Sequence, residues 1–139
     1  MKATDELIVI NKTYDFVLWC AQHAGRFPRN HRYTLGTRIE QQLYDVLELL
    51  LQAKYRVNER LGLLQAVNLK LEVLRFQLRL AHDLQCWKTN SFGFACQSLD
   101  EIGRMIGGWL KATEKAASQK PAGLAERSSP GGPTRPAKP

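Results

Sequence analysis

The spacing of apolar residues constrains this chain more than any other feature. From residue 5 to about residue 117, apolar side chains recur every three or four positions, and no window shows the strict alternation of a half-buried strand. This spacing predicts four helices, at about 5–24, 31–57, 59–85 and 94–117. Because the connectors between them are short, we expect an all-α fold, an antiparallel up-down-up-down four-helix bundle.

Two of the predicted helices show how the bundle should pack. In the first helix the spacing directs one stripe toward the core: Leu7, Ile10, Tyr14, Val17, Leu18 and Ala21. The third helix has an inner stripe made of Leu64, Val67, Leu71, Leu74, Leu78 and Ala81, and a second row made of Leu69, Val73, Phe76, Leu80 and Leu84. An antiparallel bundle normally buries one broad stripe per helix, so the second row could face a neighbouring subunit.

The composition changes sharply after the last periodic segment. Residues 118–139 hold all but one of the six prolines and almost no large apolar side chain. Their basic residues, Lys120, Arg127, Arg135 and Lys138, face a single acid, Glu126. We therefore expect one bundle domain over residues 1–117, followed by a disordered, proline-rich, basic tail over 118–139.

Local signals suggest where the helices begin. The candidate N-caps are Thr4 or Asp5, Asn30 and Asn58. The composition of residues 86–94, with Asn90, Ser91 and Gly93, favours a loop before the fourth helix. Ser98 and Glu101 are spaced like a capping box, or they lie inside a helix that begins earlier.

The residues that usually carry chemistry are sparse. The core stripes contain no paired carboxylates and no Glu-x-x-His motif, and the chain has neither a P-loop nor a dinucleotide-binding glycine fingerprint. The three cysteines form no C-x-x-C pair, and the three histidines are scattered. We expect no enzymatic activity, no cofactor and no metal. Without a long apolar stretch or a signal-like N-terminus, a cytoplasmic protein that contacts no membrane is expected.

Charge is the most informative functional signal, with a formal net charge of +7. Around the connector between the first two helices and the start of the second, from Arg26 to Arg38, the chain carries four arginines, with aromatic residues between them and no acid: Arg26, Arg29, Arg32 and Arg38. Guanidinium groups pair with phosphate, and interleaved aromatic rings can stack on unpaired bases. This segment therefore predicts contact with single-stranded or irregular nucleic acid, unless it is only a solvated turn between helices.

A second basic group lies on the third helix. Arg75, Arg79 and His82 share one face, bordered by Glu72 and Asp83. Both phosphate binding and pairing with the neighbouring acids would account for two arginines there. The spacing alone leaves both interpretations open.

Three glycines lie within six positions of the fourth helix: Gly103, Gly107 and Gly108. Each costs roughly 0.5–1 kcal/mol relative to alanine in a helix interior. Gly103 and Gly107 share a face, so we expect another helix to approach them closely beside Trp109. The alternative is a frayed or broken helix.

Two runs on these last helices resemble a known family. Leu74-Arg75-Phe76-Gln77-Leu78-Arg79-Leu80 and Glu101-Ile102-Gly103-Arg104-Met105-Ile106-Gly107-Gly108-Trp109-Leu110 are similar to the accessory variability determinant (Avd-like) proteins of diversity-generating retroelements. Phe27-Pro28-Arg29 and the run from Leu35 to Ile39 are similar to this family too, and to the related four-helix proteins encoded in intervening sequences of ribosomal RNA. The resemblance covers essentially the whole bundle.

The resemblance implies a homopentameric barrel of four-helix bundles with a basic surface. Such a protein would bind the element's reverse transcriptase and its template RNA, with DNA binding left open, and would support mutagenic cDNA synthesis without catalytic residues of its own. Arg75 and Arg79 would lie on the basic surface, whereas Gly107, Gly108 and Trp109 would be structural. The alternative is a purely structural or protein-interaction bundle of the ribosomal RNA intervening-sequence type.

Overall fold

Four long helices make up the fold in the computed structural model, which describes residues 1–119. They are α1 (Ala3–Ala24), α3 (Thr37–Tyr55), α4 (Arg60–Asp83) and α5 (Thr89–Ser118). Two short elements, α2 (Arg29–His31) and the π-helical η1 (Arg32–Gly36), lie between α1 and α3, and the 3-10 helical η2 (Val57–Glu59) lies between α3 and α4. Within these 119 residues there is no strand.

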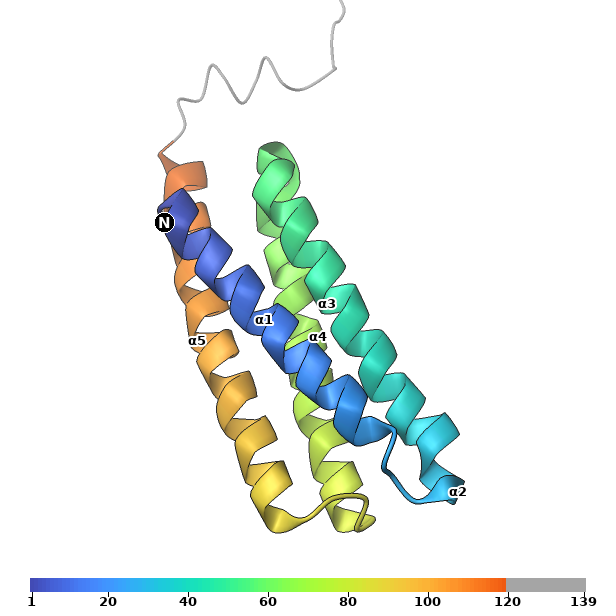
Figure 1. Cartoon of the computed structure of the whole chain (residues 1–139). Helices are drawn as coiled ribbons and strands as arrows, with labels where there is room; N and C mark the ends of the chain where they lie inside the picture. Colours follow the sequence, from blue (N-terminus) through green and yellow to red (C-terminus); the bar gives the residue numbers. More distant parts are fainter. Residues whose placement is uncertain (120–139) are drawn as a thin grey trace, which may run out of the picture.

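The long helices run up and down in chain order, as expected. Helices α1 and α4 each pack against both α3 and α5, so α1 and α4 lie diagonally across the bundle (Figure 1). The predicted antiparallel four-helix bundle is confirmed. The predicted disordered tail, apart from Ser118 and Gln119, lies outside the described residues.

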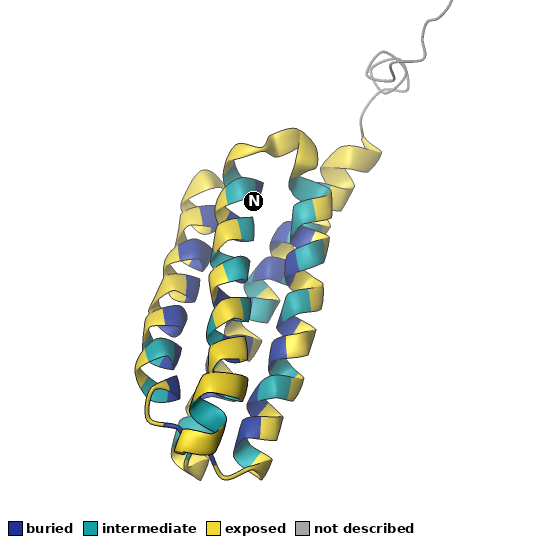
Figure 2. Ribbon diagram, turned by 90° about the vertical axis from the view of Figure 1, so that its right-hand side faces the viewer, coloured by how far each residue is buried: buried dark blue, intermediate teal, exposed yellow. Residues whose placement is uncertain are grey.

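The core runs along the axis of the bundle, where each long helix contributes one buried stripe (Figure 2). The inner stripe predicted for α4 is buried at all six positions, from Leu64 to Ala81. Burying a leucine or valine side chain stabilises the fold by about 1.5–3 kcal/mol. The second row of α4, from Leu69 to Leu84, is exposed along its whole length.

The stripe predicted for the first helix is only partly right: Ile10 and Val17 are buried and Ala21 is half-buried. Leu7, Tyr14 and Leu18 are exposed, and the buried face consists of Glu6, Val9, Ile10, Thr13, Phe16, Val17, Cys20 and Ala24. Apolar residues occur on both sides of α1, so two stripes satisfied the spacing. The buried stripe accepts Thr13 because its hydroxyl donates a hydrogen bond to the Val9 carbonyl at 2.8 Å.

The last helix begins five residues earlier than predicted, at Thr89 rather than 94. Its first turn forms because the Phe92 amide donates to the Lys88 carbonyl at 3.0 Å and the Phe92 ring stacks on His82 of α4, with ring centroids 4.2 Å apart. This packing outweighs the low helix propensity of Asn90, Ser91 and Gly93. Ser98 and Glu101 consequently lie inside α5 and form no capping box.

The other predicted helix starts are also corrected. The segment predicted as one helix over 31–57 is divided among α2, η1 and α3, and α3 ends at Tyr55. Pro28 precedes the first turn, and its carbonyl accepts from the amides of His31 and Arg32, both at 2.9 Å. Asn30 lies within that turn, Asn58 lies within η2, and Lys2 occupies the N-cap position of α1. None of these three starts has a side-chain cap.

The turn between α4 and α5 contains one strained residue. Gln85 has a left-handed backbone, with φ of 61°, and the Cys86 amide donates to the Ala81 carbonyl at 2.8 Å to close α4. Glycine adopts this conformation without steric cost.

We expect Gln85→Gly to raise the free energy of unfolding by about 0.5–1 kcal/mol, measured by urea titration. Gln65→Gly, in the interior of α4, should instead lower it by about 1 kcal/mol. A loss of stability in Gln85→Gly would contradict the strain.

Candidate nucleic-acid interface

The connector between α1 and α3 projects its arginines from one end of the bundle. Phe27 anchors it: the ring is buried, and the Phe27 amide donates to the Ala24 carbonyl at 3.1 Å. With Phe27 directed inward, Arg26 and Arg29 on either side are exposed. One buried aromatic side chain therefore positions two cations at the surface.

The other two predicted arginines differ in how firmly they are held. Arg32 donates from Nε to the Phe27 carbonyl at 3.2 Å, and its guanidinium carbon lies 6.0 Å from the centre of the Tyr33 ring. Arg38 is exposed in the first turn of α3. Across residues 1–119, neither arginine forms an ion pair, and neither do Arg26 and Arg29. These four positive charges are not neutralised by carboxylates of the described chain.

The turn between α4 and α5 brings a further cation to the same end of the molecule (Figure 1). Trp87 lies edge-on to Phe27, with ring centroids 5.3 Å apart, and Lys88 next to it is exposed. We call the group formed by Arg26, Arg29, Arg32, Arg38 and Lys88 the basic end. Sequence reasoning missed Lys88 because its proximity depends on how the two connectors pack.

Arg75 lies in a different environment. Its Nη1 is 2.6 Å from Glu72 Oε1, and its Nε is 3.6 Å from Asp100 Oδ1 on α5. Gly103 leaves the room for this arrangement, because a Cβ at Gly103 would lie 2.7 Å from Arg75 Nη2. Arg75 therefore links α4 to α5, with its charge opposed by two carboxylates.

The Arg79 side chain is more exposed than that of Arg75, which lies one helical turn earlier in α4. Its side chain is 69% exposed against 35% for Arg75, and its Nε lies 4.0 Å from Asp83 Oδ2. Glu72, Asp83 and Asp100 surround the two arginines, so carboxylates outnumber guanidiniums on this face. These carboxylates would repel an anion that approaches this face, whereas the arginines of the basic end form no ion pair within the described residues.

The glycine-rich part of α5 is continuous, so the broken-helix alternative is wrong. The expectation that another helix lies against Gly103 and Gly107 is also wrong within the described residues. Gly103 faces an arginine side chain, and nothing lies within 4 Å of the Cβ positions at Gly107 and Gly108. Trp109 is buried in the core, next to these open positions.

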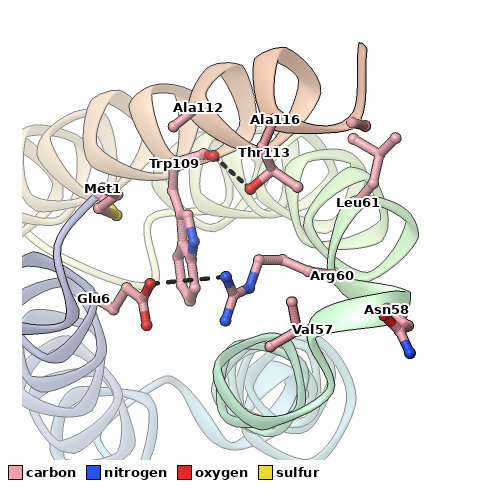
Figure 3. Close-up of a pocket in the computed structure, with 11 residues that line it drawn as sticks. Met1, Glu6, Val57, Asn58, Arg60, Leu61, Trp109, Ala112, Thr113 and Ala116 are labelled. Carbon is pink, nitrogen blue, oxygen red and sulfur yellow. Dashed lines mark hydrogen bonds and ion pairs between the residues drawn. The ribbon is translucent and has the colours of Figure 1, made fainter. Parts of the chain in front are cut away.

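An ion cluster closes the opposite end of the bundle, where α3 ends and α4 begins. Figure 3 shows two of its members, Glu6 and Arg60, beside Trp109. Glu6 lies 3.6 Å from Lys54 Nζ and 3.9 Å from Arg60 Nη1, and all three side chains are largely buried. Arg60 donates to the carbonyls of Ala53 and Lys54 at 2.7 and 2.9 Å, which satisfies the last turn of α3. Its guanidinium also lies 5.5 Å from the centre of the Trp109 ring. No local motif joins Glu6, Lys54 and Arg60, so sequence reasoning missed the cluster.

This cluster borders a cavity of about 380 Å³. Apart from the ion pair, the walls are mostly apolar, and the Thr113 hydroxyl donates to the Trp109 carbonyl at 2.8 Å. Glu6 and Arg60 are thus engaged in joining α1, α3 and α4, and the Thr113 hydroxyl is bonded within α5. The arrangement stabilises the bundle and offers no nucleophile paired with a base.

The cysteines have little thiolate character. Burial raises the pKa of the Cys20 thiol, and the nearby Glu40 carboxylate adds to the effect. Burial likewise raises the pKa of Cys86 and of Cys96, and the Asp100 carboxylate adds to the effect at Cys96.

Among residues 1–119, no group of three or more His, Cys, Asp or Glu side chains could hold a metal ion. No helix in this range is long and apolar enough to cross a membrane.

A family model described as bAvd-like matches residues 7–113, from the first turns of α1 to the last turns of α5. The chain belongs to the bAvd-like family. The match confirms the resemblance carried by the two motifs, and it covers both the basic end and the ion cluster apart from Glu6. Avd-like proteins are accessory and non-catalytic, so this bAvd-like chain is of an accessory kind. A search of curated proteins found no match.

Proposed function

We propose that this bAvd-like protein is a nucleic-acid-binding accessory subunit of a diversity-generating retroelement. It binds the element's template RNA and its reverse transcriptase and supports mutagenic cDNA synthesis. Family membership supports the retroelement role, and the basic end is the observation that carries RNA binding. Unpaired guanidinium groups projecting from one end of a rigid bundle are suited to bind phosphates.

The basic end makes the main phosphate contacts, with Arg79 as a secondary contact. Arg26, Arg29 and Arg38 are exposed and free of carboxylate partners within the described chain, so they lose no ion pair when they meet phosphate. Arg75 would have to leave both Glu72 and Asp100. RNA binding should therefore survive removal of Arg75 better than removal of the basic end.

Purified full-length protein tests this function directly. Its affinity for the RNA of the adjacent template repeat should fall steeply as salt rises, because bound cations are released from the phosphates. Pull-down with the neighbouring reverse transcriptase should recover both proteins. An RNA affinity that does not change with salt would exclude phosphate binding, and the absence of both interactions would leave only a structural bundle.

Two exposed apolar areas support self-association. One is the outer row of α4, including Leu69, Val73 and Phe76. The other involves α1 and α3, which pack side by side, and contains Leu7, Tyr14, Leu18, Tyr44 and Leu51. Contact between two different faces is heterologous and closes a ring when the rotation fits. We propose a ring of five copies, the number that the family resemblance implies.

Replacement of Phe76 tests the self-association. Its side chain is 65% exposed in the single chain, so Phe76→Glu should leave the fold intact while placing a charge in the proposed interface. We expect native mass spectrometry to show the mass of one chain for this variant. Val57→Glu, at a residue 63% exposed in η2, is the matched control and should keep the assembly. If Phe76→Glu keeps the mass of the assembly, as Val57→Glu should, the interface lies elsewhere.

A further inference from the structure

A groove opens beside the basic end, between the π-helical turn η1, the start of α3 and the last turn of α4. Its volume is about 550 Å³. Leu35, Leu80 and Leu84 form its apolar side, and His31 and Arg38 contribute nitrogen donors. No carboxylate lines it. The groove therefore combines an apolar wall with positive charge.

The π-helical turn shapes the rim of this groove. Its wider backbone is supported by two hydroxyls: Thr34 Oγ1 lies 3.4 Å from the His31 carbonyl, and Thr37 Oγ1 lies 3.5 Å from the Arg32 carbonyl. The Tyr33 ring projects from this turn and is 73% exposed. Short π-helical segments occur frequently at functional sites. Here the segment presents an aromatic ring next to Arg38 and an apolar wall.

We propose that this groove holds one unpaired nucleotide of an RNA strand. Its base lies against Leu80, Leu84 and the Tyr33 ring, and its phosphate meets Arg38. This inference rests on the proposed RNA binding and specifies the form of RNA that is bound. A base has an apolar face only when it is unpaired and unstacked, whereas a duplex presents mainly phosphates and sugars.

The charge of the groove favours this occupant over a second copy of the chain. Leu80 and Leu84 also end the outer row of α4, so a neighbouring subunit would be the other candidate. An apolar face laid over the groove would desolvate the Arg38 guanidinium, which has no carboxylate partner in residues 1–119. A nucleotide supplies both the apolar surface and the negative charge.

The test compares one mixed-sequence RNA strand, fluorescently labelled, with the same strand annealed to its complement. Full-length protein should bind the unpaired strand at least roughly fivefold more tightly in fluorescence anisotropy, because base stacking adds to phosphate contact. Charge alone would favour the duplex, whose phosphates are denser. Tyr33→Ala should remove the preference without weakening duplex binding.

Tyr55→Ala is the matched control, since Tyr55 is 75% exposed and lies at the other end of α3. It should leave both affinities unchanged. Equal affinity of the unaltered protein for the two RNAs would overturn the groove proposal alone, and so would equal effects of the two tyrosine variants. A lowered native mass for Tyr33→Ala would show a second copy in the groove and overturn it too. No binding to either RNA would overturn both this inference and the proposed function.

Discussion

The triple variant Arg26→Glu, Arg29→Glu, Arg38→Glu should lose RNA affinity by at least about 100-fold at physiological salt. Three cations that meet phosphate become three anions that repel it, and most of the net charge of +7 is removed. The slope of log affinity against log salt should fall by about 2 in magnitude, as expected for three lost contacts to a single strand. Fluorescence anisotropy across a salt series measures both quantities.

A control with the same change in net charge separates placement from overall charge. Arg104, Lys111 and Lys115 are exposed along α5, and their replacement by glutamate alters the charge equally. This control should retain most of the RNA affinity. If both triple variants lose affinity to the same extent, net charge alone drives binding and the basic end has no special role. Unchanged circular dichroism in both would exclude unfolding as the cause.

Arg60→Ala should lower the free energy of unfolding by about 3 kcal/mol, the largest effect on stability that we expect from a single charged residue. The change removes the donors to the Ala53 and Lys54 carbonyls at the end of α3, one partner of buried Glu6, and the cation over Trp109. Urea titration at one fixed protein concentration measures it, because self-association also shifts apparent stability.

Arg56→Ala provides the comparison. Arg56 lies four residues earlier, at the end of α3, and its ion pair with Glu59 is exposed, so the loss should stay below about 0.5 kcal/mol. Similar midpoints for Arg60→Ala and Arg56→Ala would show that the ion cluster contributes little. A large loss in Arg60→Ala alone would establish it as the contact that closes this end of the bundle.

Local spacing was sufficient to predict the features that depend on a single helix. The inner stripe of α4 was correct at every position, because its apolar residues follow one clear helical repeat. The exposed arginines of the connector were likewise visible as a run without acids. For α1 the same reasoning was right for Ile10 and Val17 and wrong for Leu7, Tyr14 and Leu18, since exposed and buried residues satisfy the repeat equally well.

Features that depend on distant residues could not be predicted in this way. For Arg75, spacing left open both phosphate binding and pairing with neighbouring acids. The contact with Asp100 joins α4 to α5, so spacing within one helix could not predict it. The space at Gly103 that admits Arg75 was misread as a site for helix packing. Lys88 joins the basic end only through the packing of Trp87 on Phe27.

The sequence by itself determined the helical class, the number of long helices and the acid-free charge of the connector, because helical repeat and charge are properties of neighbouring residues. Only the tertiary structure decided which face of α1 is buried, which arginines keep their charge unpaired, and where the groove opens. These depend on helix contacts between residues far apart in the chain, and several faces of a helix can satisfy the same local spacing. The outcome is set by how the side chains of all four helices fill one core.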